Sequence, residues 1–164
     1  MSIGFSEILR FYSGEPISSI SNFHRSKKTI RDIYTYNQRM LEENDDFIEW
    51  IFPIPTLYEI KKLKEHSIVF TWLKIFKYKM FEYWGISPKN EINAVLLNGH
   101  NGLKLCRAIE CLTLFGINID KEMDVLKQLI IEGVVFPRLT KYENDLMPIW
   151  SVKQKEAEKL IFYT

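Results

Sequence analysis

The sequence has few of the residues that join a fold covalently or through a metal ion. It contains 2 Cys and 3 His among 164 residues. On a helix, Cys106 and Cys111 would lie roughly 140° apart around the axis and about 7.5 Å apart along it, which is too far for a disulfide. Tetrahedral zinc sites need four ligands at characteristic spacings, and the chain has no CxxC pair. We therefore predict two reduced packing thiols, no metal and no cofactor.

Long hydrophobic runs and an excess of charge are also lacking. The most hydrophobic window, 68–84, is interrupted by Lys74, Lys77, Lys79 and Glu82, whereas a membrane span needs roughly 18 apolar residues or more. The N-terminus has no basic region followed by a long apolar run, and Ser2 excludes N-myristoylation. The net charge is +1, so no global field holds nucleic acid or an anionic membrane. We expect a soluble cytoplasmic protein, or a nuclear one in a eukaryotic or viral source.

Apolar and aromatic residues, in contrast, are plentiful. They make up 46% and 14% of the chain, with aromatics counted in both figures. A chain of this length and composition can bury one hydrophobic core. We therefore predict a single domain over 1–164.

Most of the chain carries helix signals. Thr29-x-x-Asp32 and Thr56-x-x-Glu59 are capping boxes, the first expected to open a helix through Ile33, Tyr36 and Met40. Asn44, followed by two acidic residues, predicts a further helix start. The segment 67–83 repeats apolar residues at helical spacing, and Gly85 and Pro88 end it.

The segment 103–115 is apolar around most of a helical circumference, which is typical of a central helix covered by others. Further helices are predicted over 6–11, 120–132 and 151–163. Val134–Phe136 is the only strand-like run, and 137–148 is expected to be irregular or weakly helical. The fold class is therefore all-α, with about six to seven helices around the 103–115 helix.

Five sequence blocks extend the interpretation. They are FY at 11–12, LEENDDFIEWIFP at 41–53, TLYEIKKLKEH at 56–66, MFEYWGI at 80–86 and HNGLKLCRAIECLTLFGI at 100–117. In order and spacing the chain resembles, over 11–131, the conserved domain of the opioid growth factor receptor family. The resemblance implies an all-helical domain. It does not imply enkephalin binding, because Asp45, Phe47 and Glu49 replace that family's polar and aromatic residues in the main block.

The loop NGHNG at 98–102 is the first candidate binding site. Polar loop residues beside a helix N-terminus often bind ligands, anions in particular, so Asn98, His100 and Asn101 are candidate ligand-binding residues. His100 would be the general acid or base if the site were catalytic. Alternatively, Asn101 only caps the central helix and His100 packs over it.

Glu49 and Trp50 are the second candidate set. They lie in the main block, and a groove between the Trp50 helix and the 103–115 helix would suit a peptide. The alternative is that Trp50 is a core residue and the acids near it, including Glu49, form a solvated face at a helix N-terminus.

Lysines and aromatics interleave over 61–79, a pattern that single-stranded nucleic acid can use. However, Trp72 and Phe76 fall on the predicted core stripe while Lys74 and Lys77 fall opposite. A solvated face is therefore the favoured interpretation, and nucleic acid is not expected as a partner.

Together these patterns favour a small helical module that binds a protein, a peptide or another ligand. The alternative is an enzyme or accessory subunit that acts on a small molecule near 98–102. The chain has no GxSxG, HExxH, GxxxxGK[ST] or GxGxxG signature. We therefore assign no catalytic residue and no metal ligand.

Overall fold

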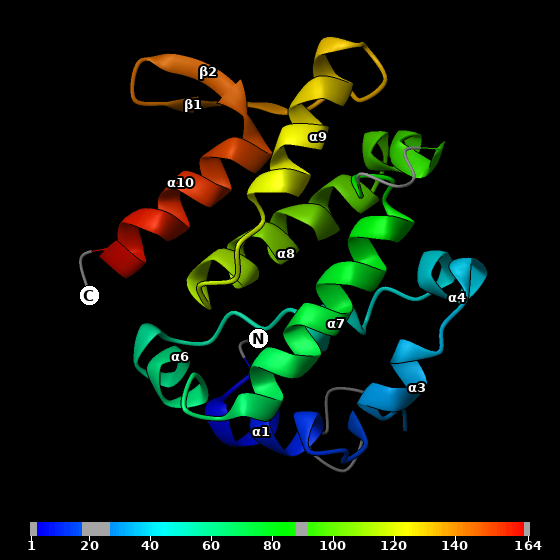
Figure 1. The fold of residues 1–164 in the computed structure, drawn as a ribbon, viewed down its shortest axis with the longest axis vertical. Coiled ribbons are helices and arrows are strands. Elements are labelled where there is room, and N and C mark those ends of the chain that lie inside the picture. The colour runs from blue at the N-terminus through cyan, green and yellow to red at the C-terminus, as the bar shows by residue number, and fades with distance from the viewer. Residues whose placement is uncertain (1–2, 18–26, 88–91, 163–164) are drawn as a thin grey trace. The chain divides into compact units, whose positions relative to one another are not determined.

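The computed structural model describes residues 3–17, 27–87 and 92–162. It divides into two compact units, Met1–Phe76 and Lys77–Thr164, and each is described by itself (Figure 1). The prediction of a single domain over 1–164 stays a prediction. The predicted helix stop at Pro88 lies outside the described residues, as does His24.

Helices dominate the described part of the chain. They account for 64% of the structure, in ten helices, and a two-stranded antiparallel sheet completes it. The prediction of a mainly helical protein is confirmed. The prediction of a purely α-helical fold with six to seven helices is wrong. None of the described helices is long and apolar enough to cross a membrane.

The first unit consists of short helices. They are α1 (Phe5–Tyr12), α3 (Ile30–Tyr34), α4 (Gln38–Glu43), α5 (Ile48–Ile51), α6 (Leu57–Leu63) and the first part of α7 (Ser67–Tyr83). Both predicted capping boxes are present, at the start of α3 and of α6. The helix expected through Ile33, Tyr36 and Met40 is interrupted, because Asn37 opens α4 by accepting the Met40 N–H at 2.9 Å. This new start is one source of the additional helices.

Asn44 does not start a helix. It lies at the C-terminal end of α4, where its Nδ2 donates to the Met40 carbonyl at 2.8 Å. The next helix, α5, follows Phe47 and has no side-chain cap. An Asn side chain can bond the backbone on either side of a helix terminus, so the residue type alone did not decide between the two ends.

Helix α5 lies in the core of the first unit. The Trp50 ring packs against Phe11 with 5.3 Å between ring centroids, and both are buried. The Tyr12 hydroxyl donates to the Ile51 carbonyl at 3.0 Å. Aromatic packing plus one buried hydrogen bond therefore fixes a helix too short to be stable alone.

The second unit is built on α8 (Asn101–Leu114). Its other elements are the end of α7, the 3-10 helix η1 (Ile92–Asn98), α9 (Asp120–Ile131), β1 (Leu139–Tyr142), β2 (Asp145–Pro148) and α10 (Ile149–Phe162). Leu105, Ala108, Ile109, Cys111 and Leu112 of α8 are fully buried. Both η1 and α10 pack against α8, which explains why its sequence is apolar around most of its circumference.

The sheet occupies the segment expected to be irregular. Strand β1 pairs antiparallel with β2, and Tyr142 lies opposite Asp145. The loop between them, 143–144, has no glycine, and Glu143 adopts a φ of 57°. The sequence therefore lacks the Asn-Gly or Asp-Gly signal typical of hairpins. The strand-like run at 134–136 forms no strand, because the Val134 and Val135 N–H groups donate to the Leu129 carbonyl at the end of α9.

Both cysteines are buried and free, as predicted. Burial raises the pKa of the Cys106 thiol to about 11 and raises the pKa of Cys111 still further. In the unfolded chain these thiols should lose their protons near pH 8.5.

We predict that the thiols destabilise the fold at alkaline pH. As the pH rises through about 8.5 toward 11, the unfolded thiols ionise while the native ones stay protonated, so the free energy of unfolding falls. A Cys106→Ala/Cys111→Ala variant should lose less stability over this range in urea titrations. If the free energy of unfolding falls equally with pH in the variant and in the original protein, the prediction is contradicted.

Gly85 and Gly133 provide a second test. Their φ angles are +70° and +75°, but a Cβ on Gly85 would lie 2.4 Å from the Ala94 nitrogen, whereas a Cβ on Gly133 would meet no atom within 4 Å. Backbone strain alone should make Gly133→Ala cost about 1–2 kcal/mol. The added clash should make Gly85→Ala cost about 3 kcal/mol or more. Thermal melts with equal shifts for both variants would show that the end of α7 and η1 do not lie this close.

Candidate functional site

The 98–102 loop joins η1 to α8 with little backbone left for a ligand. The Gly102 N–H donates to the Gly99 carbonyl at 3.0 Å, and the Leu103 N–H donates to the His100 carbonyl at 3.2 Å. Two of the amide groups that a helix N-terminus offers to an anion are therefore bonded to the preceding turn. His100 occupies the N-cap position with a helical backbone and no side-chain cap bond.

Asn101 is a core residue. It is 1% exposed, and its Oδ1 accepts the Trp84 indole N–H at 3.0 Å. It therefore neither caps α8, as one interpretation of the sequence expected, nor faces solvent. The bond satisfies a buried indole donor and links α8 to the turn that follows α7.

Asn98 holds the chain that follows α9. Its Oδ1 accepts the Phe136 N–H at 2.8 Å and its Nδ2 donates to the Val134 carbonyl at 3.2 Å. Both ends of the amide are thus bonded within the protein. This pair of bonds places Phe136 beside the start of α8.

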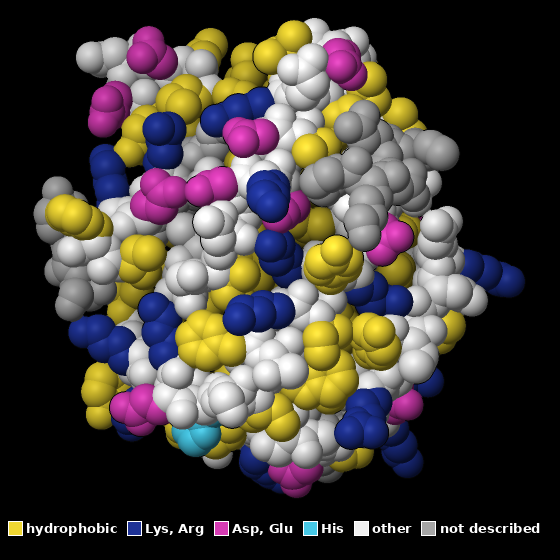
Figure 2. Space-filling model, viewed as in Figure 1, with side chains coloured by type: hydrophobic (Ala, Val, Ile, Leu, Met, Phe, Trp, Pro, Cys, Tyr) yellow, Lys and Arg dark blue, Asp and Glu magenta, His cyan; other side chains and the backbone are white. Residues whose placement is uncertain are grey.

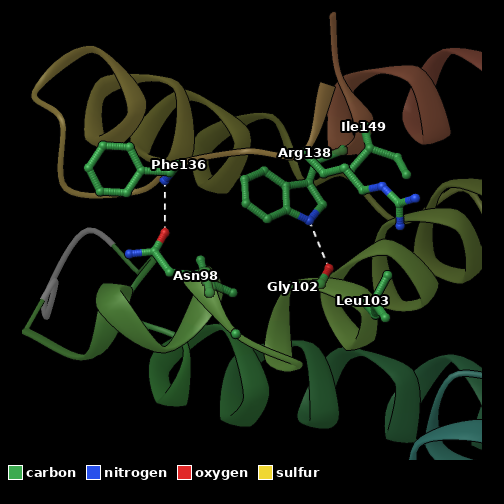
Figure 3. Close-up of a pocket in the computed structure, with 9 residues that line it drawn as sticks. Asn98, Gly102, Leu103, Phe136, Arg138 and Ile149 are labelled. Atoms are coloured by element: carbon green, nitrogen blue, oxygen red, sulfur yellow. Dashed lines mark hydrogen bonds between the residues drawn. The ribbon is translucent and has the colours of Figure 1, made fainter. Parts of the chain in front are cut away.

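A cavity of about 220 Å³ lies at this point of the second unit (Figure 3). Apolar side chains, two glycines, one amide and one guanidinium line it: Leu97, Asn98, Gly99, Gly102, Leu103, Phe136, Arg138, Ile149 and Trp150. The Trp150 indole N–H donates to the Gly102 carbonyl at 2.8 Å and is buried. A Cβ on Gly102 would lie 2.7 Å from the Leu97 carbonyl oxygen and 3.4 Å from Trp150, so glycine allows this close approach.

The cavity has two distinct ends. In Figure 3, Asn98 and Phe136 lie at one end, while Leu103, Arg138 and Ile149 lie at the other. Leu103 and Phe136 are 61% and 69% exposed, so both present apolar surface to solvent. Arg138 is exposed, and its carbonyl accepts the Ile149 N–H at 2.8 Å, which closes the base of the hairpin.

Sequence reasoning identified Asn98 but missed Phe136, Arg138 and Trp150. These residues are more than thirty positions from the loop, and two of them follow α9 in a segment without helical periodicity. The Phe-Pro-Arg run at 136–138, which interrupts the helical pattern, was the available signal.

The other candidate residues do not line the cavity. His100 is exposed and is not among the lining residues. Glu49 and Trp50 belong to α5 in the first unit, where Trp50 is buried against Phe11 and Glu49 is half-buried. The predicted groove between the Trp50 helix and the 103–115 helix involves both units and stays a prediction.

Some of the basic and aromatic residues of α7 make contacts within the protein, whereas Lys74 and Tyr78 are exposed. The Trp72 ring stacks on Phe76, with 5.9 Å between centroids, and Phe76 is fully buried. Lys77 Nζ lies 3.0 Å from Glu122 Oε1. On the face drawn in Figure 2, Lys and Arg side chains are scattered among acidic and hydrophobic ones. Within the described ranges, no group of three or more His, Cys, Asp or Glu residues could hold a metal ion.

The Trp84–Asn101 bond predicts a stability effect. Asn101→Leu should cost about 1–3 kcal/mol, because it leaves a buried indole N–H without its acceptor. Adding Trp84→Phe removes that donor, so the double variant should lose less stability than the sum of the two single variants. Additive losses in urea unfolding would contradict a coupled pair.

Comparisons with known proteins give no relative. The chain matches no family model, no curated protein and no solved structure. The resemblance to the opioid growth factor receptor family thus rests on the five sequence blocks and stays a prediction.

Proposed function

We propose that this protein is a binding module whose second unit receives an apolar side chain of a partner polypeptide. The observation that carries the proposal is the cavity at the start of α8, with buried Trp150 in its wall and exposed Leu103 and Phe136 beside it. Apolar residues that are exposed singly are common on proteins. Here two of them border the same cavity, one at each end, so a partner side chain in the cavity meets exposed apolar surface at both ends.

The size of the cavity supports a side chain rather than a cofactor or large metabolite. Small-molecule sites usually enclose about 300–1,000 Å³, and this cavity has about 220 Å³. A single Phe or Leu side chain is of a suitable size. Full burial of such a side chain contributes roughly 1.5–3 kcal/mol, so one contact of this kind gives weak binding that a longer interface would strengthen.

The chemistry of the lining also favours binding over catalysis. The nine lining residues include no His, Cys, Asp, Glu, Lys, Ser or Tyr. A general acid or base has to reach the reacting atom directly or through one water. We therefore place the binding-module hypothesis ahead of an enzyme acting near 98–102.

The proposal extends to family and location. Two of the five blocks coincide with buried elements, 41–53 with α5 and 100–117 with α8, which supports a divergent relative of the opioid growth factor receptor domain. We propose a protein or peptide partner without proposing enkephalin. Two buried free thiols are consistent with a reducing compartment such as the cytoplasm or nucleus.

Peptide titration tests the proposal. We predict that N-acetyl-Ala-Ala-Phe, added to the nitrogen-15-labelled full chain, shifts the NMR signals of the Trp150 indole and of the Gly99, Gly102 and Leu103 amides. N-acetyl-Ala-Ala-Ala should shift them much less, because its side chain is too small to fill the cavity.

Variants of Leu103 and Phe136, the exposed rim of the cavity, test where the peptide binds. The double variant Leu103→Ser/Phe136→Ser should bind N-acetyl-Ala-Ala-Phe at least severalfold more weakly in the NMR titration, since it lacks apolar surface that the phenyl side chain covers. Phe162→Ser is the matched control, because Phe162 is 81% exposed and does not line the cavity. Equal binding of the two peptides, or an unchanged response in the rim variant, would refute the proposed site.

A further inference from the structure

We infer that the partner presents a C-terminal apolar residue, whose free carboxylate binds Arg138 while its side chain enters the cavity. This inference rests on the proposed function and specifies the partner's chemistry. It follows from the hydrogen bonds that the polar groups of the cavity already make, and from the positive charge of Arg138.

Three lining side chains carry N–H groups: Asn98, Trp150 and Arg138. Asn98 uses one of its two amide N–H groups on the Val134 carbonyl, and the Trp150 indole donates to the Gly102 carbonyl. The Arg138 guanidinium has no hydrogen bond or ion pair to any residue that the structure describes. It is therefore the charged side-chain donor that a ligand can engage.

The lining backbone adds few competing donors. The N–H groups of Gly99, Gly102 and Leu103 donate to the Leu96, Gly99 and His100 carbonyls, and the Phe136 N–H donates to Asn98. An anionic group at this cavity would thus find its one cationic partner among the lining residues in Arg138. Arginine binds carboxylates through two parallel N–H donors, which fixes orientation as well as charge.

The charge of the lining selects an anion. Arg138 is the one charged side chain among the nine lining residues. A neighbouring hollow of about 270 Å³ shares Ile149 but contains Lys141, Lys153, Glu143 and Glu156, so its charges balance. The uncompensated positive charge therefore belongs to the cavity that holds Leu103 and Phe136.

The geometry favours an α-carboxylate over an acidic side chain. Arg138 lies with Leu103 and Ile149 at one end of a cavity sized for one side chain (Figure 3). A ligand must therefore carry its apolar group and its carboxylate close together. In a C-terminal residue both groups are attached to the same Cα, which meets this requirement without ordering a second side chain.

The experiment compares three peptides on the full chain by NMR titration. They are N-acetyl-Ala-Ala-Phe with a free carboxylate, its C-terminal amide, and the amide N-acetyl-Ala-Asp-Phe-NH2. We predict that the free acid binds about threefold to fivefold more tightly than either amide, the upper part of the range expected for an exposed ion pair. The difference in affinity between the free acid and the amides should become smaller at high salt, because salt screens the ion pair.

Arg138→Gln should abolish the preference for the acid, so that the acid and its amide bind this variant equally tightly. Lys141→Gln, which changes an exposed charge outside the cavity, should retain the preference. Equal binding of acid and amide, with shifts at the cavity, would overturn the carboxylate inference and leave the proposed function intact. Binding of the Asp-containing amide as tight as the acid would overturn the C-terminal assignment. No response to any peptide would overturn both proposals.

Discussion

The contact between Trp150 and Gly102 is the constraint on which the second unit depends. The indole N–H donates to the Gly102 carbonyl, and the missing Cβ lets the Leu97 carbonyl oxygen lie close to the same residue. This contact fixes the start of α10 on the start of α8. The hairpin ends where α10 begins, so the Arg138–Ile149 backbone bond at its base is placed by the same contact. The cavity is the space left between these fixed pieces.

The amides of the 98–102 loop complete this arrangement. Asn101 points into the core and accepts the Trp84 indole, while Asn98 bonds the chain around Phe136. A loop that is polar in sequence is therefore mostly bonded to its own protein. This internal use of the two Asn side chains leaves Arg138, contributed from a distant segment, as the charged group available to a ligand.

Local signals were enough to predict much of the helical structure. The capping boxes at Thr29 and Thr56 are decided within four residues, and the extent of α7 follows from its apolar spacing. Asn37 and Asn44 show the limit of such signals, because an Asn can bond either end of a helix.

The hairpin and the cavity depend on contacts distant in sequence. Strands β1 and β2 are joined without glycine, and their stability comes in part from α10. Phe136 and Arg138 reach the start of α8 through Asn98 and Ile149, and no local pattern encodes these pairings. The sequence therefore indicated the loop beside the cavity as a candidate site but could not identify the other residues that surround the cavity.

The most direct test of the central claim is to locate a bound side chain by isotope-filtered NOE measurements with N-acetyl-Ala-Ala-Phe. If the cavity at the start of α8 is the binding site, the phenyl protons of the peptide show NOEs to the methyl groups of Leu103 and Ile149. NOEs confined to other exposed methyl groups, such as those of Ile131 or Leu160, would contradict the proposed site.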